Sequence, residues 1–269
     1  MASNNADTKM DPADDADQIL FFSIIGGLCP LIPVPCLDGV FLKVVRRLMA
    51  AAQLRHAGLQ ATIGQVNVLA REPQTSPQEC AMKAAYYGLC CCTLEFVLKK
   101  VCFFLTLKDC VDNASELLHE GWLIAYAAKA KFVTQPTLAD KAELWRVSEA
   151  IVKACDEADT TIMKRALHEV FGNSRQDMNN SANTVDGALR VQGVRGNCLS
   201  KPSDESVQEA LDAVETVQRG ELRGVTGELA RVLRSQRPHF SKLEQAFVTK
   251  LGKLRESNAQ GPHCSLLPC

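Results

Sequence analysis

The pattern of apolar and polar positions divides the chain into a charge-free stretch near the N-terminus and a series of helical periods after it. Residues 19–37 read ILFFSIIGGLCPLIPVPCL and contain no charged residue. A run of this length is typical of a membrane-spanning segment, because about 20 helical residues cross the apolar core of a bilayer. A Gly-Gly pair and three prolines interrupt it, and proline removes a backbone donor. The pattern predicts a helix from Ile19 to about Leu28, followed by an extended proline turn.

A basic amphipathic pattern follows directly. Phe41–Leu54 has apolar residues at helical spacing, and residues 41–60 hold four basic residues and no acid. A basic amphipathic helix beside an apolar run is suited to an anionic lipid surface. If residues 19–37 span a bilayer, these bases place the following chain on the cytoplasmic side. We therefore expect residues 19–58 to insert into or lie on a membrane, with lipid contacts from Phe21, Phe22, Ile24, Ile25, Pro33, Pro35, Lys43, Arg46 and Arg47.

The overall composition keeps a second interpretation open. The chain has 269 residues, of which 46% are hydrophobic and 23% are charged, so it is long enough to bury a core without metals or disulfides. The mean hydropathy of −0.05 and the charges at Glu95, Lys99 and Lys100 favour a soluble helical scaffold or homo-oligomer, with the proline turn and the cysteines in its core. The formal net charge of −1 argues against a nucleic-acid binder, which usually has a basic surface.

The remaining periodicity is helical as well. Apolar residues at helical spacing predict further helices within residues 60–80, 77–107, 112–135, 137–154 and 160–172. Thr137 with Asp140, and Ser241 with Glu244, have the spacing of capping boxes and predict helix starts. No alternation typical of a strand occurs, so the predicted fold class is all-α.

The composition also suggests how the chain is organised. Residues 1–18 carry a net charge of −4 and predict a disordered acidic tail, residues 173–202 have the composition of a linker, and residues 257–269 predict a loose tail. Residues 19–172 form the predicted helical, membrane-associated domain. Residues 203–256 repeat apolar positions at helical spacing, among them Leu229 and Phe247, and predict two or three antiparallel helices. We expect a helical bundle with a C-terminal amphipathic hairpin that binds a protein partner or a second copy.

The chain contains twelve cysteines. The acidic start of the sequence lacks the basic region of a secretory signal, so we expect free thiols and a reducing, cytoplasmic compartment for the main body. Several cysteines lie inside apolar runs, where a thiol behaves as a small apolar side chain. The candidates for reversible palmitoylation are Cys29, Cys36 and Cys90–Cys92.

Motifs for chemistry are scarce. The sequence lacks the glycine-rich phosphate loops, the zinc-protease motif, the serine nucleophile motif and Cys-x-x-Cys. Glu116 and His119 have the Glu-x-x-His spacing of carboxylate-bridged di-metal bundles, but that site needs a second copy, which the chain lacks. We interpret them as a surface pair and predict no catalytic residue, cofactor or metal. A metal-binding helical enzyme is the remaining alternative.

Two segments resemble a family of uncharacterised bacterial helical proteins. The first carries Ile-Pro-x-Pro-x-x-Asp followed by an Arg-Arg helix, and the second a Phe-Phe pair followed by Lys and Asp. The matching residues are Ile32, Pro33, Pro35, Asp38, Arg46, Arg47, Phe103, Phe104, Lys108 and Asp112. The proline turn is also similar to the membrane-associated domain of unknown function attached to some bacterial Era-like GTPases, although this chain has no GTPase domain. The resemblance covers about residues 19–172 and implies a helical, membrane-linked protein without implying an activity.

Overall fold

The computed structural model describes residues 12–31, 38–70, 103–174 and 223–259, and these ranges are helical and contain no strand. The predicted all-α fold class is therefore confirmed. The described helices are α1 (Pro12–Leu28), α2 (Asp38–His56), α3 (Ile63–Leu69), α6 (Phe103–Lys129), α7 (Gln135–Ala139), α8 (Lys141–Asp156), α9 (Thr161–Asn173), α12 (Arg223–Ser235) and α13 (Arg237–Ala259), with a 3₁₀ turn, η1, over Cys29–Leu31.

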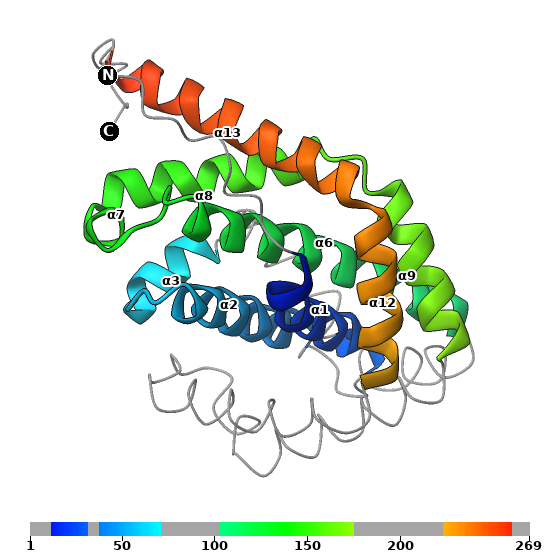
Figure 1. The fold of residues 1–269 in the computed structure, drawn as a ribbon. Coiled ribbons are helices and arrows are strands. Elements are labelled where there is room, and N and C mark those ends of the chain that lie inside the picture. Colours follow the sequence, from blue (N-terminus) through cyan, green and yellow to red (C-terminus); the bar gives the residue numbers. More distant parts are fainter. Residues whose placement is uncertain (1–11, 32–37, 71–102, 175–222, 260–269) are drawn as a thin grey trace, which may run out of the picture.

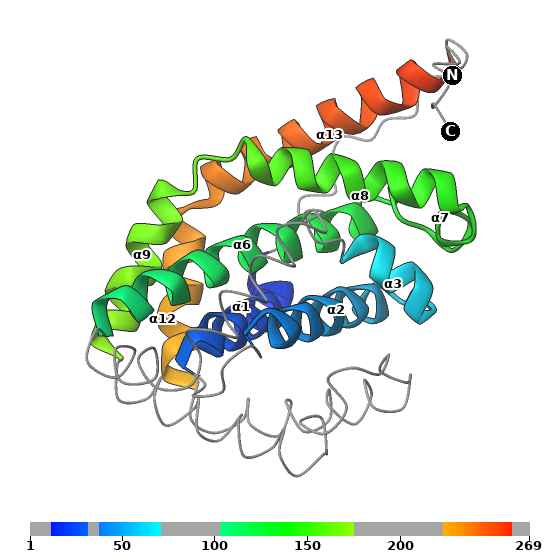
Figure 2. The ribbon, with the colours of Figure 1, turned by 180° about the vertical axis from the view of Figure 1, so that it is seen from behind.

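The helices stack in layers around α6. α6 packs against α1 and α2 on one side and against α8 and α13 on the other. α9 and α12 close one end of the stack, where α12 lies across α1 and α9 (Figure 1). The view from behind shows the same order, with α6 between the α1–α2 layer and the α8–α13 layer (Figure 2). α6 is thus the central helix of the described structure.

α1 is a buried helix of the core and packs against α6, α2 and α12. It begins at Pro12 and not at Ile19, so the predicted disordered tail over residues 1–18 extends too far. Proline is favoured in the first turn of a helix because its missing N–H has no helical partner there. The side chains from Ile19 to Cys29 are buried, and the hydroxyl of Ser23 donates to the carbonyl of Ile19 at 2.8 Å. Its one polar group in this stretch is therefore satisfied inside the helix.

Two glycines bring α1 close to α6. A Cβ added at Gly26 would lie 1.9 Å from Cδ1 of Leu117, and one added at Gly27 would lie 2.9 Å from the carbonyl oxygen of Cys110. Real Cβ atoms do not approach other atoms so closely. The Gly-Gly pair therefore does not interrupt the helix, which continues to Leu28, but permits close packing of α1 on α6.

Side-chain caps fix the ends of several helices. Thr62 and Gln65 form a reciprocal capping box at the start of α3. Asp140 caps α8 by accepting from the backbone N–H groups of Ala142 and Glu143 at 2.9 and 3.2 Å. The two predicted capping boxes are wrong, because Thr137 lies inside α7 and Ser241 lies inside α13.

The C-terminal helices belong to the common core. α12 and α13 meet at Gln236, but α12 packs mainly on α1 and α9, whereas α13 packs on α8 and α6. Val225, Leu229, Phe240 and Phe247 join the same apolar cluster as α1. The two helices are amphipathic, as predicted, yet their apolar faces cover the body of the protein and do not close a separate hairpin.

Within the described ranges, no helix combines the length and the apolar character that a bilayer crossing requires. The proline turn at residues 32–37, the predicted helix up to residue 102, and the linker after residue 174 lie outside the described residues.

Candidate functional site: a polar cleft beside a buried histidine pair

Two histidines from distant parts of the chain are in contact where the first turn of α13 packs on α6. Nε2 of His119 on α6 lies 2.8 Å from Nε2 of His239 on α13. Nδ1 of His119 lies 2.6 Å from the carbonyl oxygen of Ser115, one helical turn earlier. Because a carbonyl oxygen can only accept, His119 carries its proton on Nδ1, and its Nε2 accepts from the Nε2–H of His239. The pair therefore joins α6 to α13 in one defined tautomer arrangement.

Burial keeps this histidine pair neutral. His119 is 1% exposed, and desolvation by burial lowers its pKa to about 4, although the hydrogen bond that Nδ1–H donates to the carbonyl of Ser115 acts to raise it. The pKa of His239 is also lowered, first by burial and less by the charge of Lys242, while Asp159 acts in the opposite direction. At neutral pH the contact is thus a hydrogen bond between two uncharged rings.

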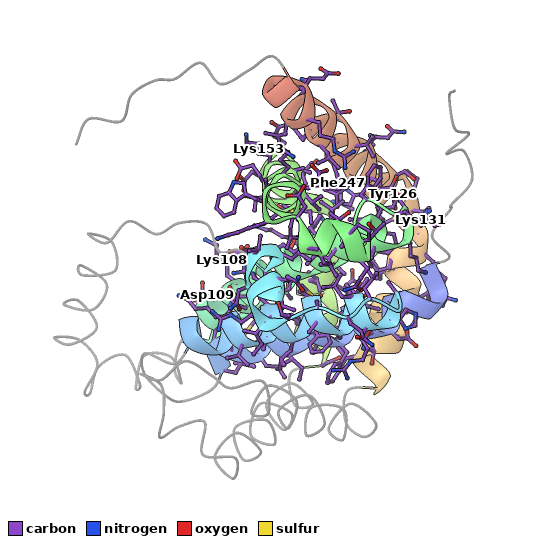
Figure 3. All side chains as sticks on the ribbon, turned by 90° about the vertical axis from the view of Figure 1, so that its left-hand side faces the viewer. Lys108, Asp109, Tyr126, Lys131, Lys153 and Phe247 are labelled. Carbon is purple, nitrogen blue, oxygen red and sulfur yellow. The ribbon has the colours of Figure 1, made fainter. Side chains whose placement is uncertain are left out.

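Aromatic packing surrounds the pair. The ring of Phe240 lies on the indole of Trp122, with a centroid distance of 4.3 Å, and the indole N–H donates to Glu244 at 2.9 Å. The guanidinium of Arg237 lies over the same indole at 5.7 Å from its centroid. Further along α13, Phe247 packs edge-on against the ring of Tyr126 of α6, and both residues lie beside α13 in the side view (Figure 3). α13 is therefore held on α6 by aromatic as well as polar contacts.

A buried ion pair holds the other side of α6. Arg46 on α2 donates from Nε to Glu120 and from Nη2 to Glu116, both at 2.6 Å. Arg46 is 4% exposed, and Glu120 is nearly as well buried. Two charge-assisted hydrogen bonds from one guanidinium to acids one turn apart on α6 fix the position of α2 on α6.

A polar cleft of about 230 Å³ opens between α6, α8 and the start of α9. The α6 residues that line it follow one helical stripe, and α8 and α9 supply the facing wall. The lining residues are Asp112, Ser115, Glu116, His119, Glu120, Val152, Cys155, Asp156, Thr160 and Lys164. Lys164 pairs with Asp112 at 2.7 Å. The hydroxyl oxygen of Ser115 is buried and has no hydrogen-bond partner among the described residues.

Cys155 lies in the wall of this cleft as a free thiol. Burial, together with the nearby charges of Glu120 and Asp156, raises its pKa well above the ordinary value. A thiol that stays protonated is a poor nucleophile and a poor metal ligand. Cys155 therefore contributes a neutral wall to the cleft and not a reactive group.

On the far side of His239 lies a second cleft, of about 470 Å³, between the α8–α9 turn and the start of α13. Charged residues of both signs line it, Glu157 and Asp159 against Lys242, together with apolar residues that include the exposed Ile162. The histidine pair thus separates two clefts of different character.

The outer face of the C-terminal helices is basic. Residues 223–259 hold eight basic and three acidic residues, which gives a formal charge of +5 in a chain of −1. Part of this charge pairs with acids of α8 and its C-terminal end, since Arg255 binds Glu143 and Lys250 binds Glu157. Besides Arg255, the exposed bases of these two helices are Arg231, Arg234, Lys242 and Lys253, and these four define the basic outer face. Lys242 lies at the edge of this face, where it also lines the second cleft.

The residues predicted to contact lipid are scattered by the fold. Phe21, Phe22, Ile24 and Ile25 are at most 3% exposed and belong to the core of the protein, so in this structure they present no surface to lipid. Arg46 is buried and paired with Glu116 and Glu120. Lys43 is exposed and Arg47 partly exposed, whereas Pro33 and Pro35 lie outside the described residues.

The predicted surface pair of Glu116 and His119 also differs from expectation. His119 is buried and bound to His239, while Glu116 is bound to Arg46. In the part of the chain that the structure describes, no group of three or more histidine, cysteine or acidic residues could hold a metal ion. Cys29 is buried in the core, and Cys36 and Cys90–Cys92 lie outside the described residues.

Sequence reasoning missed the partner of His119 and the polar stripe around Ser115. The stripe had a signal, since residues 112, 115, 116, 119 and 120 recur at helical spacing on α6. His239 had none, because the residue comes from a segment 120 positions away. Comparisons of the chain with protein families, with curated proteins and with solved structures found no match. The resemblance to bacterial helical proteins therefore stays a prediction.

Proposed function

We propose that this protein is a non-enzymatic helical scaffold that adsorbs to an anionic lipid surface through the basic outer face of α12 and α13. The observation that carries the proposal is the formal charge of +5 over residues 223–259, in a chain whose net charge is −1. Both helices lie on the outside of the body, α13 along one edge and α12 across one end (Figure 1).

The mode of attachment follows from what these helices have already buried. Most of their large apolar residues, such as Val225 and Phe240, are buried in the core and are not available for insertion, and Val248 is the exposed exception among the described residues. The exposed bases remain, and each Lys or Arg near an anionic surface contributes about 1 kcal/mol, an attraction that salt screens. Four such residues support reversible adsorption and not permanent anchoring.

This proposal moves the lipid contact from the N-terminal half to the C-terminal half. α2 carries the predicted basic face, but Arg46 is turned into the protein and paired with two glutamates. Lys43, Arg47 and Arg55 remain exposed or partly exposed on α2, and α12 and α13 together expose more bases than this. The burial of the apolar residues of α1 supports the same change, because insertion of α1 would require the core to open.

Vesicle sedimentation with the full-length protein tests the proposal. Vesicles that contain phosphatidylserine should bind the protein at low salt and release it at high salt, whereas phosphatidylcholine vesicles should not bind it. The variant Arg231→Gln, Arg234→Gln, Lys242→Gln, Lys253→Gln should lose binding. The matched control, Lys43→Gln, Arg47→Gln, Lys108→Gln, Lys153→Gln, removes the same charge elsewhere and should keep it.

Equal loss of binding in the two variants would reject the assignment to α12 and α13, because it would show an effect of net charge alone. If the wild-type protein does not sediment with phosphatidylserine vesicles at low salt, lipid adsorption is rejected. A scaffold that does not contact lipid is then the second candidate, and it is favoured by the burial of Cys29, Cys110 and the apolar face of α1 in one core. A single species on a sizing column would support that candidate.

A further inference from the structure

One buried polar atom of the cleft between α6, α8 and α9 has no hydrogen-bond partner among the described residues. Ser115 is 0% exposed, it lines the cleft, and its Oγ lacks a hydrogen-bond partner among the described residues. A buried hydroxyl without a partner costs free energy, because it has lost its hydrogen bonds to water. Two other buried serines show the contrast, since the hydroxyls of Ser23 and Ser148 each donate to a backbone carbonyl.

We propose that this cleft binds a small organic cation of the alkylamine class, with an ammonium group hydrogen-bonded to the Oγ of Ser115. A hydroxyl oxygen can accept from an ammonium N–H, and the carboxylates beside it match the positive charge. The cleft is a different site from the basic outer face of α12 and α13, and the inference does not rest on the lipid-binding proposal.

The charges around the cleft favour a cation. Four carboxylates line it, and two bases accompany them, Lys164 in the wall and Arg46 behind Glu116 and Glu120. Lys164 is paired with Asp112, and Arg46 is shared by Glu116 and Glu120. With Asp156, the four acids exceed the two bases by two negative charges. An alkyl diamine has two positive charges and balances this excess.

The arrangement suits an amine better than a metal ion. No set of three or more candidate ligands in the described residues converges on a metal position. An ammonium group needs acceptors at about 2.7–2.9 Å and no closed cage, so dispersed acceptors are sufficient. His119 does not compete with the carboxylates as an acceptor for the ammonium group, because its Nε2 already accepts from His239.

The size and the apolar wall of the cleft select a short molecule. Its volume of about 230 Å³ is below the range of roughly 300–1,000 Å³ that is common for drug-sized ligands. Val152 and the neutral thiol of Cys155 line the side opposite α6. They can pack against a short carbon chain between two ammonium groups.

Isothermal titration calorimetry of the full-length protein with diaminobutane tests this inference. We expect saturable binding of diaminobutane, and no saturable heat with butanediol, which has a similar shape without charge. Ser115→Ala should weaken binding about ten-fold or more, because it removes one hydrogen bond to a charged group. Asp156→Asn should weaken it less. Asp109→Asn, which changes an exposed acid on α6 outside the cleft, should leave it unchanged.

Thermal unfolding without amine separates loss of the site from loss of the fold. Ser115→Ala should unfold at the same or a higher temperature, because it removes a buried hydroxyl that no described residue hydrogen-bonds. The inference is overturned if diaminobutane gives no saturable heat, if butanediol binds equally well, or if Ser115→Ala and Asp109→Asn have the same affinity. Saturable binding of magnesium chloride in competition with diaminobutane would also overturn it, in favour of a metal site.

Discussion

α6 packs against α1 and α2 on one side and against α8 and α13 on the other, and these two interfaces are built from different interactions. On the first side, two glycines bring the backbones together and one buried arginine binds two glutamates. On the second side, aromatic rings and a histidine pair make the contact, and ion pairs lie at its solvent-exposed edge. The polar cleft adjoins this second interface, because His119 also lines the cleft.

The difference shows that the burial of a basic residue decides how much its ion pair contributes to stability. α2 and α13 are both basic amphipathic helices, yet Arg46 is enclosed whereas Lys250 and Arg255 stay at the surface. Removing one partner of a buried ion pair leaves an uncompensated charge in the interior, whereas a surface pair is screened by water. The first interface should therefore respond far more strongly to loss of a single charge.

Arg46→Met should have the largest effect on stability. The substitution keeps much of the side-chain volume but leaves Glu120 buried without its partner. We expect the free energy of unfolding to fall by about 3–5 kcal/mol. Urea denaturation followed by circular dichroism measures this change, provided the variant folds.

Two further variants complete this experiment. Arg47→Met alters the adjacent, partly exposed residue and should change stability by less than about 1 kcal/mol. Adding Glu120→Leu to Arg46→Met should restore part of the loss, because the buried charge is gone. Equal effects of the two arginine variants would contradict a special role for the buried pair.

Acid should weaken the interface with α13 through His119. Its folded-state pKa of about 4 lies below the unfolded value of about 6.5, so the unfolded chain binds a proton first as the pH falls. The stability contributed by the neutral ring is complete above pH 6.5 and is lost between about pH 6.5 and 4, up to about 3 kcal/mol. Urea midpoints across this range measure the loss.

Carboxylates also titrate on acidification, so the histidine contribution needs matched variants. His119→Gln cannot take up this proton and should flatten the dependence of stability on pH. His168→Gln changes an exposed histidine on α9 and should leave the wild-type dependence intact. If the two variants respond identically to pH, His119 is not the group responsible.

The same glycine-to-alanine change should have opposite signs in the two regions. At Gly27 the new Cβ would meet the backbone carbonyl of Cys110, which cannot move without shifting α6, so we expect a loss of about 1–3 kcal/mol. At Gly252 on α13 nothing lies near the new Cβ, and alanine should stabilise the helix by about 0.5–1 kcal/mol. Thermal unfolding of both variants compares the two signs, and stabilisation by Gly27→Ala would refute the close-packing argument.

Local periodicity predicted the all-α fold class and, in α8, the buried face of the helix, but it placed several helix starts wrongly. The spacing of Leu144, Val147, Ile151 and Ala154 predicted α8, and these residues are its buried face. The apolar run from Ile19 was equally clear, but a run without charges is compatible with lipid and with a protein core alike. Only the surrounding helices decide between these environments, and they come from segments far along the chain.

The candidate site was less predictable for the same reason. The Glu-x-x-His spacing placed Glu116 and His119 correctly on one helix, but it gave no indication that Arg46 and His239 would bind them. The composition of residues 203–256 did not indicate the charge on the C-terminal helices, because acids and bases are equal in number over that block. Residues 223–259, by contrast, are strongly basic. Counting charge over each helix instead of over each block reveals the basic outer face.

The smallest effect is expected at the solvent-exposed edge between α8 and α13. Lys250→Ala and Arg255→Ala break the pairs with Glu157 and Glu143 in a region that water and salt screen. Each variant should lower the free energy of unfolding by at most about 1 kcal/mol, and the difference from wild type should shrink further at high salt. Arg255 also lies over the ring of Phe132, so its substitution should cost slightly more than that of Lys250 and retain part of its effect in salt. A loss at Lys250 as large as that at Arg46 would show that ion pairs, and not aromatic packing, hold α13 on the body.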